Sequence, residues 1–106
     1  ALLGADLIAH PSNLVLTHCP QAMITRCLEN RVFAVTADRV GTEDRMGVLK
    51  FIGQSQIVDP DGNILVRASE TEEEVQTVEI DLEKARDKFL TPHNHLFKDR
   101  RKDLYH

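Results

Sequence analysis

Residues 54–69, QSQIVDPDGNILVRAS, are the stretch that decides the fold of this chain. Two runs rich in β-branched and aliphatic residues flank Pro60-Asp61-Gly62-Asn63. Those four residues stand in the order that a tight turn uses. The stretch therefore predicts a β-hairpin.

The residues before this hairpin predict a strand, a helix and a second strand. An apolar run at residues 5–9 is typical of a buried strand, and residues 10–18 read as a loop. Apolar residues from 20 to 31 fall on one stripe of an amphipathic helix, with Pro20 suited to its first position. Residues 32–36 predict a strand buried on both faces. A loop bracketed by glycines is expected at 41–53.

After the hairpin, apolar residues recur in VQTVEI, and we expect a further strand at residues 75–80. Asp81 stands where the N-cap of a short helix over 82–89 belongs. The remaining residues form a polar tail. The expected order is β-α-β-β-β-α-tail. With the run 75–80 counted as well, we expect five strands.

Such an α/β layered arrangement has one face of the sheet covered by helix and little left to cover the other. Several hundred Å² of apolar sheet face corresponds to on the order of 10 kcal/mol. A whole domain is stable by only about 5–15 kcal/mol. We therefore expect another copy or another chain to complete the sheet face, and predict a homo-oligomer.

Length and composition limit the function classes. We treat residues 1–106 as a single unit, and the formal charge of −4 argues against a nucleic-acid partner. No apolar run approaches the ~20 residues that a membrane span requires, so no membrane partner is expected. Cys19 and Cys27 do not form a disulfide framework, which favours a cytoplasmic setting.

The first residues read as the end of an element. Leu2 and Leu3 resemble the last turn of a helix, and Gly4 resembles its stop. We therefore expect a segment to precede Ala1 and expect that segment to carry chemistry.

Five segments, in order and over nearly the whole chain, resemble the C-terminal half of carbon–nitrogen hydrolases of the nitrilase superfamily. They are GADLIAHPSN, RCLENRVFAVTADRVG, GQSQIVDPDGNIL, EIDLEKAR and DRRKDLY. The chain is most similar to the amidase or N-carbamoyl-hydrolase branches.

The resemblance implies half of a four-layer α-β-β-α sandwich and hydrolysis of a small amide or carbamoyl substrate by a Glu–Lys–Cys triad without a cofactor. In the family the cysteine attacks, the glutamate is the general base and the lysine stabilises the intermediate. No position of this chain matches the triad, which we expect upstream of Ala1. The resemblance therefore assigns no catalytic residue to these 106 residues.

One family role carries over, to Asn13. In related amidases an amide side chain at the last position of PSN contacts substrate, and an amide offers both a donor and an acceptor. The alternative is that Asn13 only closes an Asx turn. Three positions depart from the family pattern: Leu14 replaces a frequent Trp, Asp38 replaces the Asn of TANR, and Lys102 follows the paired arginines.

Cysteines and histidines offer rival sites. Cys19 at the start of the predicted helix, beside His18, is a candidate nucleophile, whereas Cys27 on the apolar stripe is interpreted as a core residue. The histidines suggest metal binding, but no Cys-x-x-Cys or H-E-x-x-H accompanies them, so we predict no metal site. The histidines considered are His10, His18, His93 and His95.

Charged residues have structural interpretations. The acidic run 70–74 is expected to be a solvated loop that protects a sheet edge. Arg26 and Glu29 are expected to form a buried or interfacial ion pair. Arg100 and Arg101 are expected to hold the tail against a neighbouring subunit.

Three functions remain open from the sequence: a non-catalytic structural or dimerisation module, a half-enzyme complemented by a separate N-terminal chain, and a small hydrolase that uses Cys19. Reaction with amides, co-expression with an N-terminal chain, and Cys19→Ala would distinguish them. The family assignment remains hydrolase in each case.

Overall fold

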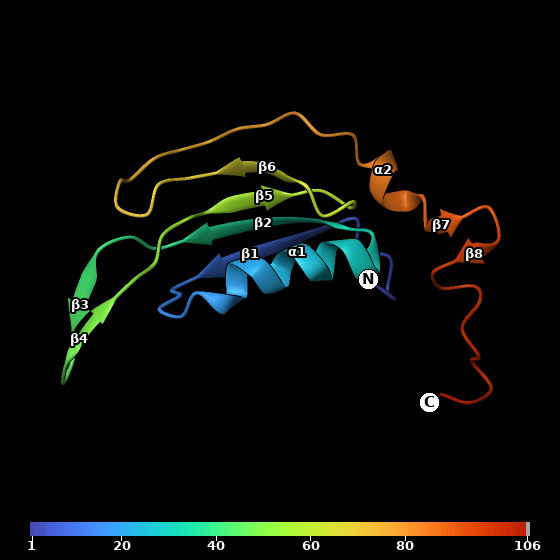
Figure 1. Cartoon of the computed structure of the whole chain (residues 1–106), viewed down its shortest axis with the longest axis horizontal. Helices are drawn as coiled ribbons and strands as arrows, with labels where there is room; N and C mark the ends of the chain where they lie inside the picture. Colours follow the sequence, from blue (N-terminus) through green and yellow to red (C-terminus); the bar gives the residue numbers. More distant parts are fainter. Residues whose placement is uncertain (106) are drawn as a thin grey trace.

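A four-stranded mixed sheet forms the centre of the computed structural model, which describes residues 1–105 (Figure 1). The strand order is β1-β2-β5-β6; β1 and β2 are parallel and the other neighbours are antiparallel. The elements are β1 (Leu7–Ser12), α1 (His18–Asn30), β2 (Phe33–Asp38), β3 (Thr42–Asp44), β4 (Val48–Lys50), β5 (Gln56–Val58), β6 (Ile64–Arg67), α2 (Glu83–Arg86), β7 (Phe89–Thr91) and β8 (Asn94–His95). The predicted mixed α/β fold is confirmed.

The hairpin predicted at 54–69 is confirmed as β5 and β6. Its turn is closed by two backbone hydrogen bonds: Asp59 N–H donates to Asn63 O at 2.9 Å, and Gly62 N–H donates to Asp59 O at 3.0 Å. Gly62 has φ +80°, a left-handed conformation that glycine adopts without steric cost.

Helix α1 covers one face of the sheet. The core there contains Cys27, Ala34 and Val58, with Ile8, Met23 and Ile24 packed against it. Ala34 pairs with Ile8 on one side and with Val58 on the other, so the cross-strand row presents its apolar side chains to the helix stripe. The predicted helix is thus confirmed, although it begins at His18. Pro20 then lies in the first turn, where no intrahelical N–H bond is lost.

Gln56 connects the start of α1 to the sheet. Its side chain is 1% exposed. The Nε2 group donates to Pro20 O at 2.7 Å, and Oε1 accepts from the Arg67 guanidinium at 2.8 Å. Both ends of this buried amide are therefore satisfied, as burial of a polar group requires.

The C-terminal end of α1 is closed by residues distant in sequence. Arg31 ends the helix in a left-handed conformation. Lys88 Nζ lies 3.0 Å from Asn30 O and 2.6 Å from Arg31 O, where a cation satisfies free helix carbonyls. Separately, Arg86 Nε lies 3.0 Å from Oδ2 of Asp6, the residue before β1.

The second face of the sheet has no helix along its length. Its central cross-strand row is Ala9, Val35, Ile57 and Val66. The last three are half-buried and Ala9 is exposed. Residues 74–76 border this face at a pocket of about 200 Å³. The expectation of one covered and one uncovered face agrees with this arrangement.

The strand expected at 75–80 was wrong. These residues run beside β6 (Figure 1) but form no ladder within the described residues, and Val75 is 91% exposed. Their apolar residues, at 75, 78 and 80, do not keep strict alternation, so the pattern fixes no register. The helix expected at 82–89 is shorter, since only α2 (Glu83–Arg86) forms, and its N-cap is Leu82 rather than the predicted Asp81. Asp81 Oδ1 nevertheless accepts the Glu83 N–H at 3.0 Å.

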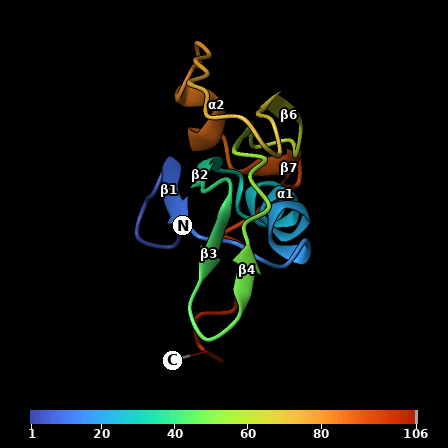
Figure 2. The same ribbon diagram turned by 90° about the vertical axis from the view of Figure 1, so that its left-hand side faces the viewer.

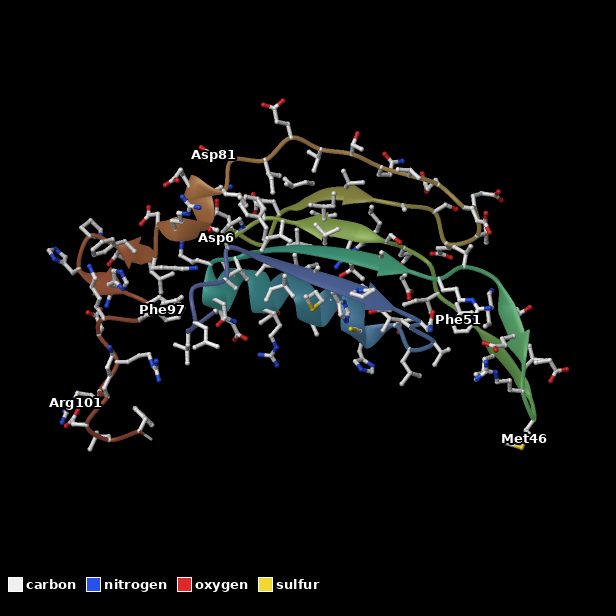
Figure 3. The ribbon with its side chains drawn as sticks, turned by 180° about the vertical axis from the view of Figure 1, so that it is seen from behind. Asp6, Met46, Phe51, Asp81, Phe97 and Arg101 are labelled. Carbon is white, nitrogen blue, oxygen red and sulfur yellow. The ribbon has the colours of Figure 1, made fainter. Side chains whose placement is uncertain are left out.

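The loop expected at 41–53 was also wrong, because β3 and β4 form a hairpin there. Figure 2 shows this hairpin projecting from the body, and Figure 3 places Met46 at its tip. Most of its side chains are exposed, so no buried face could mark its strands in the sequence. The tail likewise contains a small hairpin, β7–β8.

The two ends of the molecule extend away from the sheet. The radius of gyration is 16.4 Å, compared with about 13 Å for a compact domain of this length. The β3–β4 hairpin lies at one end and the tail at the other (Figure 1). No helix within residues 1–105 is long and apolar enough to cross a bilayer.

Candidate functional site

The candidate site lies where parallel strands β1 and β2 end. Ser12, the last residue of β1, pairs with Asp38, the last residue of β2. Residues 13–17 leave this edge and lead to α1. Ligands of open α/β sheets bind at the carboxyl ends of the strands, so this position suits a binding residue.

Asn13 begins the loop and is exposed. Among residues 1–105 its side-chain amide has no hydrogen-bond partner, so the Asx turn considered above is not formed by that side chain. A free amide at this edge can donate to one ligand atom and accept from another. Its role in substrate binding stays a prediction.

Leu14 fixes the loop through its backbone. Its N–H donates to Asp38 Oδ1 at 2.7 Å, and its carbonyl accepts from Ile52 N–H at 2.9 Å. Leu14 itself is half-buried. The residue that replaces the family's frequent Trp is therefore held on both backbone groups.

Asp38 is in turn held by Ser55. The Asp38 N–H donates to Ser55 Oγ at 2.8 Å, and the Ser55 hydroxyl donates to Asp38 O at 3.2 Å. The second carboxylate oxygen, Oδ2, is buried and has no hydrogen-bond partner among residues 1–105. One oxygen of this carboxylate thus holds the loop while the other is unpaired.

A short polar chain lies on the neighbouring positions of the same two strands. His10 Nδ1 is 3.1 Å from Thr36 Oγ1, and His10 Nε2 is 2.9 Å from Ser12 Oγ. Both ring nitrogens are therefore used within the protein. The remaining histidines do not join it in a metal site, since nowhere in residues 1–105 do three ligating side chains come together.

The two cysteines differ in environment. Cys27 is 0% exposed, as the core interpretation predicts. Burial, and secondarily the negative charge of Asp59, raises the pKa of the Cys27 thiol to about 11. Cys19 is half-buried at the start of α1. Within residues 1–105 no hydrogen bond joins it to His18, so the structure adds no support for Cys19 as a nucleophile.

The expectations for the charged residues are met only in part. The acidic run 70–74 is exposed, as expected. Arg26 and Glu29 do form an ion pair, but their side chains are 66% and 45% exposed, so the pair is not buried within this chain. Arg101 pairs with Asp103 inside the tail at 2.6 Å.

Sequence reasoning missed Asp38, Ser55 and Thr36 as parts of this site. The sequence feature that could have indicated them is the parallel pairing of the first two strands. Once residues 7–12 and 33–38 are both recognised as strands, their pairing places Ser12 beside Asp38. The expected strand limits, 5–9 and 32–36, ended too early to bring these two residues together.

Comparison with known proteins gives one family match and several relatives. Residues 1–88 match the sequence model of a family described as carbon-nitrogen hydrolase. A nitrilase from Pyrococcus abyssi is 55% identical over 105 residues, which are 99% of this chain and 39% of that protein.

Two solved structures are also similar to this chain. A carbon-nitrogen hydrolase from Helicobacter pylori is 28% identical, with TM-score 0.77 over 98% of this chain and 41% of its own. A variant of an amidase from Nesterenkonia is 25% identical, with TM-score 0.54 over 66% of this chain and 27% of its own. Its crystal contains the acetamide moiety of fluoroacetamide covalently added at the active site cysteine. The chain spans about two fifths of the length of the Pyrococcus and Helicobacter proteins.

Proposed function

Because the chain belongs to the carbon–nitrogen hydrolase family, we propose that its protein hydrolyses a non-peptide carbon–nitrogen bond of a small substrate. The substrate class is an amide or carbamoyl compound. The Nesterenkonia amidase, whose active site cysteine is modified by an amide, supports this class. The Glu–Lys–Cys triad belongs to sequence outside residues 1–106, and no cofactor takes part.

Within this segment, Asn13 contacts the substrate. The observation that carries this assignment is the free, exposed amide at the carboxyl edge of β1 and β2. A carboxamide or ureido group has donors and acceptors complementary to that amide. The hydrogen bonds to Asn13 hold the substrate in place while the cysteine attacks its carbonyl carbon.

Asn13→Ala in the complete enzyme tests the assignment. We expect the KM for amide substrates to rise about tenfold, since one hydrogen-bonded contact is lost. Asn30→Ala is the control: Asn30 is a half-buried asparagine at the opposite end of α1, and its side chain donates to Arg26 O. Equal KM values for the two variants would contradict a substrate role for Asn13.

A second sheet covers the open face. The half-buried side chains of Val35, Ile57 and Val66 support this, because they present apolar area without a layer above it. The cover is either the N-terminal half that carries the triad or, for a homo-oligomer, a second copy. A non-catalytic dimerisation module would use the same face, but without any amide hydrolysis.

Val35→Asp tests the cover, since a charge buried between two sheets is strongly destabilising. Val48→Asp is the control, because Val48 is 71% exposed on the projecting hairpin. In sedimentation velocity at micromolar concentration, we expect only Val35→Asp to lose its partner. A well-folded monomer of this chain would contradict a second copy as the cover.

The absence of a disulfide framework supports a reducing, cytoplasmic setting for this activity.

A further inference from the structure

We propose that Asp38 is a positioning residue, whose carboxylate oxygen Oδ1 holds the Leu14 N–H and thereby fixes the backbone position from which the Asn13 side chain extends. This inference rests on the proposed contact between Asn13 and substrate. It gives a functional role to a residue at the end of β2, whereas Asn13 lies in the loop that follows β1.

The first step is the geometry of one peptide unit. The atoms from Asn13 Cα to Leu14 Cα, including the Leu14 N–H, lie in one plane. The hydrogen bond from Leu14 N–H to Asp38 Oδ1, at 2.7 Å, therefore orients the plane that carries Asn13 Cα. The Leu14 carbonyl is held separately by Ile52 N–H at 2.9 Å. Because the Leu14 N–H and carbonyl are both held, the backbone position from which the exposed Asn13 side chain extends is fixed as well.

The second step is the rigidity of Asp38 itself. Its backbone lies in the β1–β2 ladder opposite Ser12. The Ser55 hydroxyl contacts both its N–H and its carbonyl, at 2.8 and 3.2 Å. Because Asp38 is fixed to the sheet in this way, its hydrogen bond to the Leu14 N–H also fixes the loop relative to the sheet.

The third step concerns the other oxygen. Asp38 Oδ2 is buried and unpaired within residues 1–105. A buried polar atom without a partner costs free energy. Stability of the sheet alone does not account for a carboxylate at this point, whereas the contact of Oδ1 with the loop does.

The experiment is a double-mutant cycle in the complete enzyme. Asp38→Ala removes the acceptor, and we expect the KM for an amide substrate to rise about tenfold while kcat changes less than about twofold. Asp38→Asn keeps an oxygen acceptor and should restore most of the parent KM. In the Asn13→Ala background, Asp38→Ala should raise KM no further, because its effect passes through Asn13.

Hydrogen exchange supplies a readout that does not depend on activity. Exchange of the peptide spanning residues 12–16 should be about tenfold faster in Asp38→Ala and unchanged in Asp38→Asn. If Asp38→Ala does not fold, Ser55→Ala provides the milder probe. It leaves the carboxylate in place, loosens its support, and should raise KM about threefold in the parent but not in the Asn13→Ala background.

The outcomes separate the two proposals. Unchanged exchange at residues 12–16, or effects of Asp38→Ala and Asn13→Ala that multiply fully, would overturn the role of Asp38. An unchanged KM in Asn13→Ala, together with faster exchange in Asp38→Ala, would overturn the substrate role of Asn13 and leave the hold on the loop established.

Discussion

Lys84 of α2 contacts the buried carboxylate of Asp59, with Nζ 2.7 Å from Oδ2. Asp59 begins the turn between β5 and β6 and is 3% exposed. Its Oδ1 also accepts the backbone N–H groups of Asp61 and Asn63, each at 2.9 Å. One carboxylate therefore shapes the turn and docks α2 on it.

Asp59→Ala should lower the free energy of unfolding by about 3 kcal/mol, because it leaves two backbone donors without their acceptor and removes the buried partner of Lys84. Asp61→Ala is the control. Asp61 also contacts Lys84, at 2.8 Å, but its side chain is 46% exposed, so its loss should cost less than about 1 kcal/mol. Urea denaturation measures both, and equal losses would contradict the central role of Asp59.

Asp59 should also make stability depend on acid pH. Burial acts to raise the pKa of this carboxyl, but hydrogen bonds from Lys84, Asn63 and Asp61 outweigh it and lower the pKa from 3.8 to about 2. A lowered folded-state pKa adds stability above the unfolded value, and that stability is lost as pH falls from about 4 to 2. The contribution is about 2 kcal/mol. Asp59→Ala should flatten the corresponding part of a plot of unfolding free energy against pH.

Gly53→Ala should be strongly destabilising. Gly53 has φ +59°, and a Cβ there would lie 2.7 Å from Glu70 O and 2.8 Å from Ser69 O. Gly41→Ala separates the two causes: φ is +87° but no atom lies within 4 Å of its Cβ. Backbone strain alone should cost Gly41→Ala about 1–2 kcal/mol. Thermal unfolding should show a larger loss for Gly53→Ala, and equal losses would mean that the backbone of 69–70 moves away freely.

Cys27 should resist alkylation. Its thiol is fully buried and its pKa is raised to about 11, so at pH 8 only about a thousandth is thiolate. Cys19 is half-buried. Iodoacetamide labelling mapped by mass spectrometry should modify Cys27 at least about tenfold more slowly than Cys19. In urea the two rates should converge; fast labelling of folded Cys27 would contradict the core assignment.

The sequence predicted those elements whose residues have one buried face. The turn residues of 60–63 marked the hairpin, and the apolar stripe that includes Cys27 marked α1. Residues 42–50 bury almost nothing, so their hairpin carries no pattern. The run 75–80 has residues that are typical of a strand, but these residues do not determine which neighbouring strand it would pair with.

The candidate site was only partly predictable for a related reason. Asn13 was predicted from the resemblance of its segment, but the contact that holds its loop comes from Asp38, 24 residues away from Leu14 in sequence. Only the parallel pairing of β1 with β2 joins them. A departure from the family pattern at residue 38 was visible in the sequence, whereas its hydrogen bond to the loop was not.

The closure of α1 by Lys88 has a consequence for synthesis on the ribosome. Lys88 and Arg31 are separated by 57 residues, and Arg86 lies 80 residues from Asp6. At about 5–20 residues per second, the helix emerges roughly 3–11 s before the lysine that caps it. Until then the last turn of the helix is free to fray. In a nascent chain this turn therefore becomes rigid only when the C-terminal residues have been made, long after the sheet has begun to form.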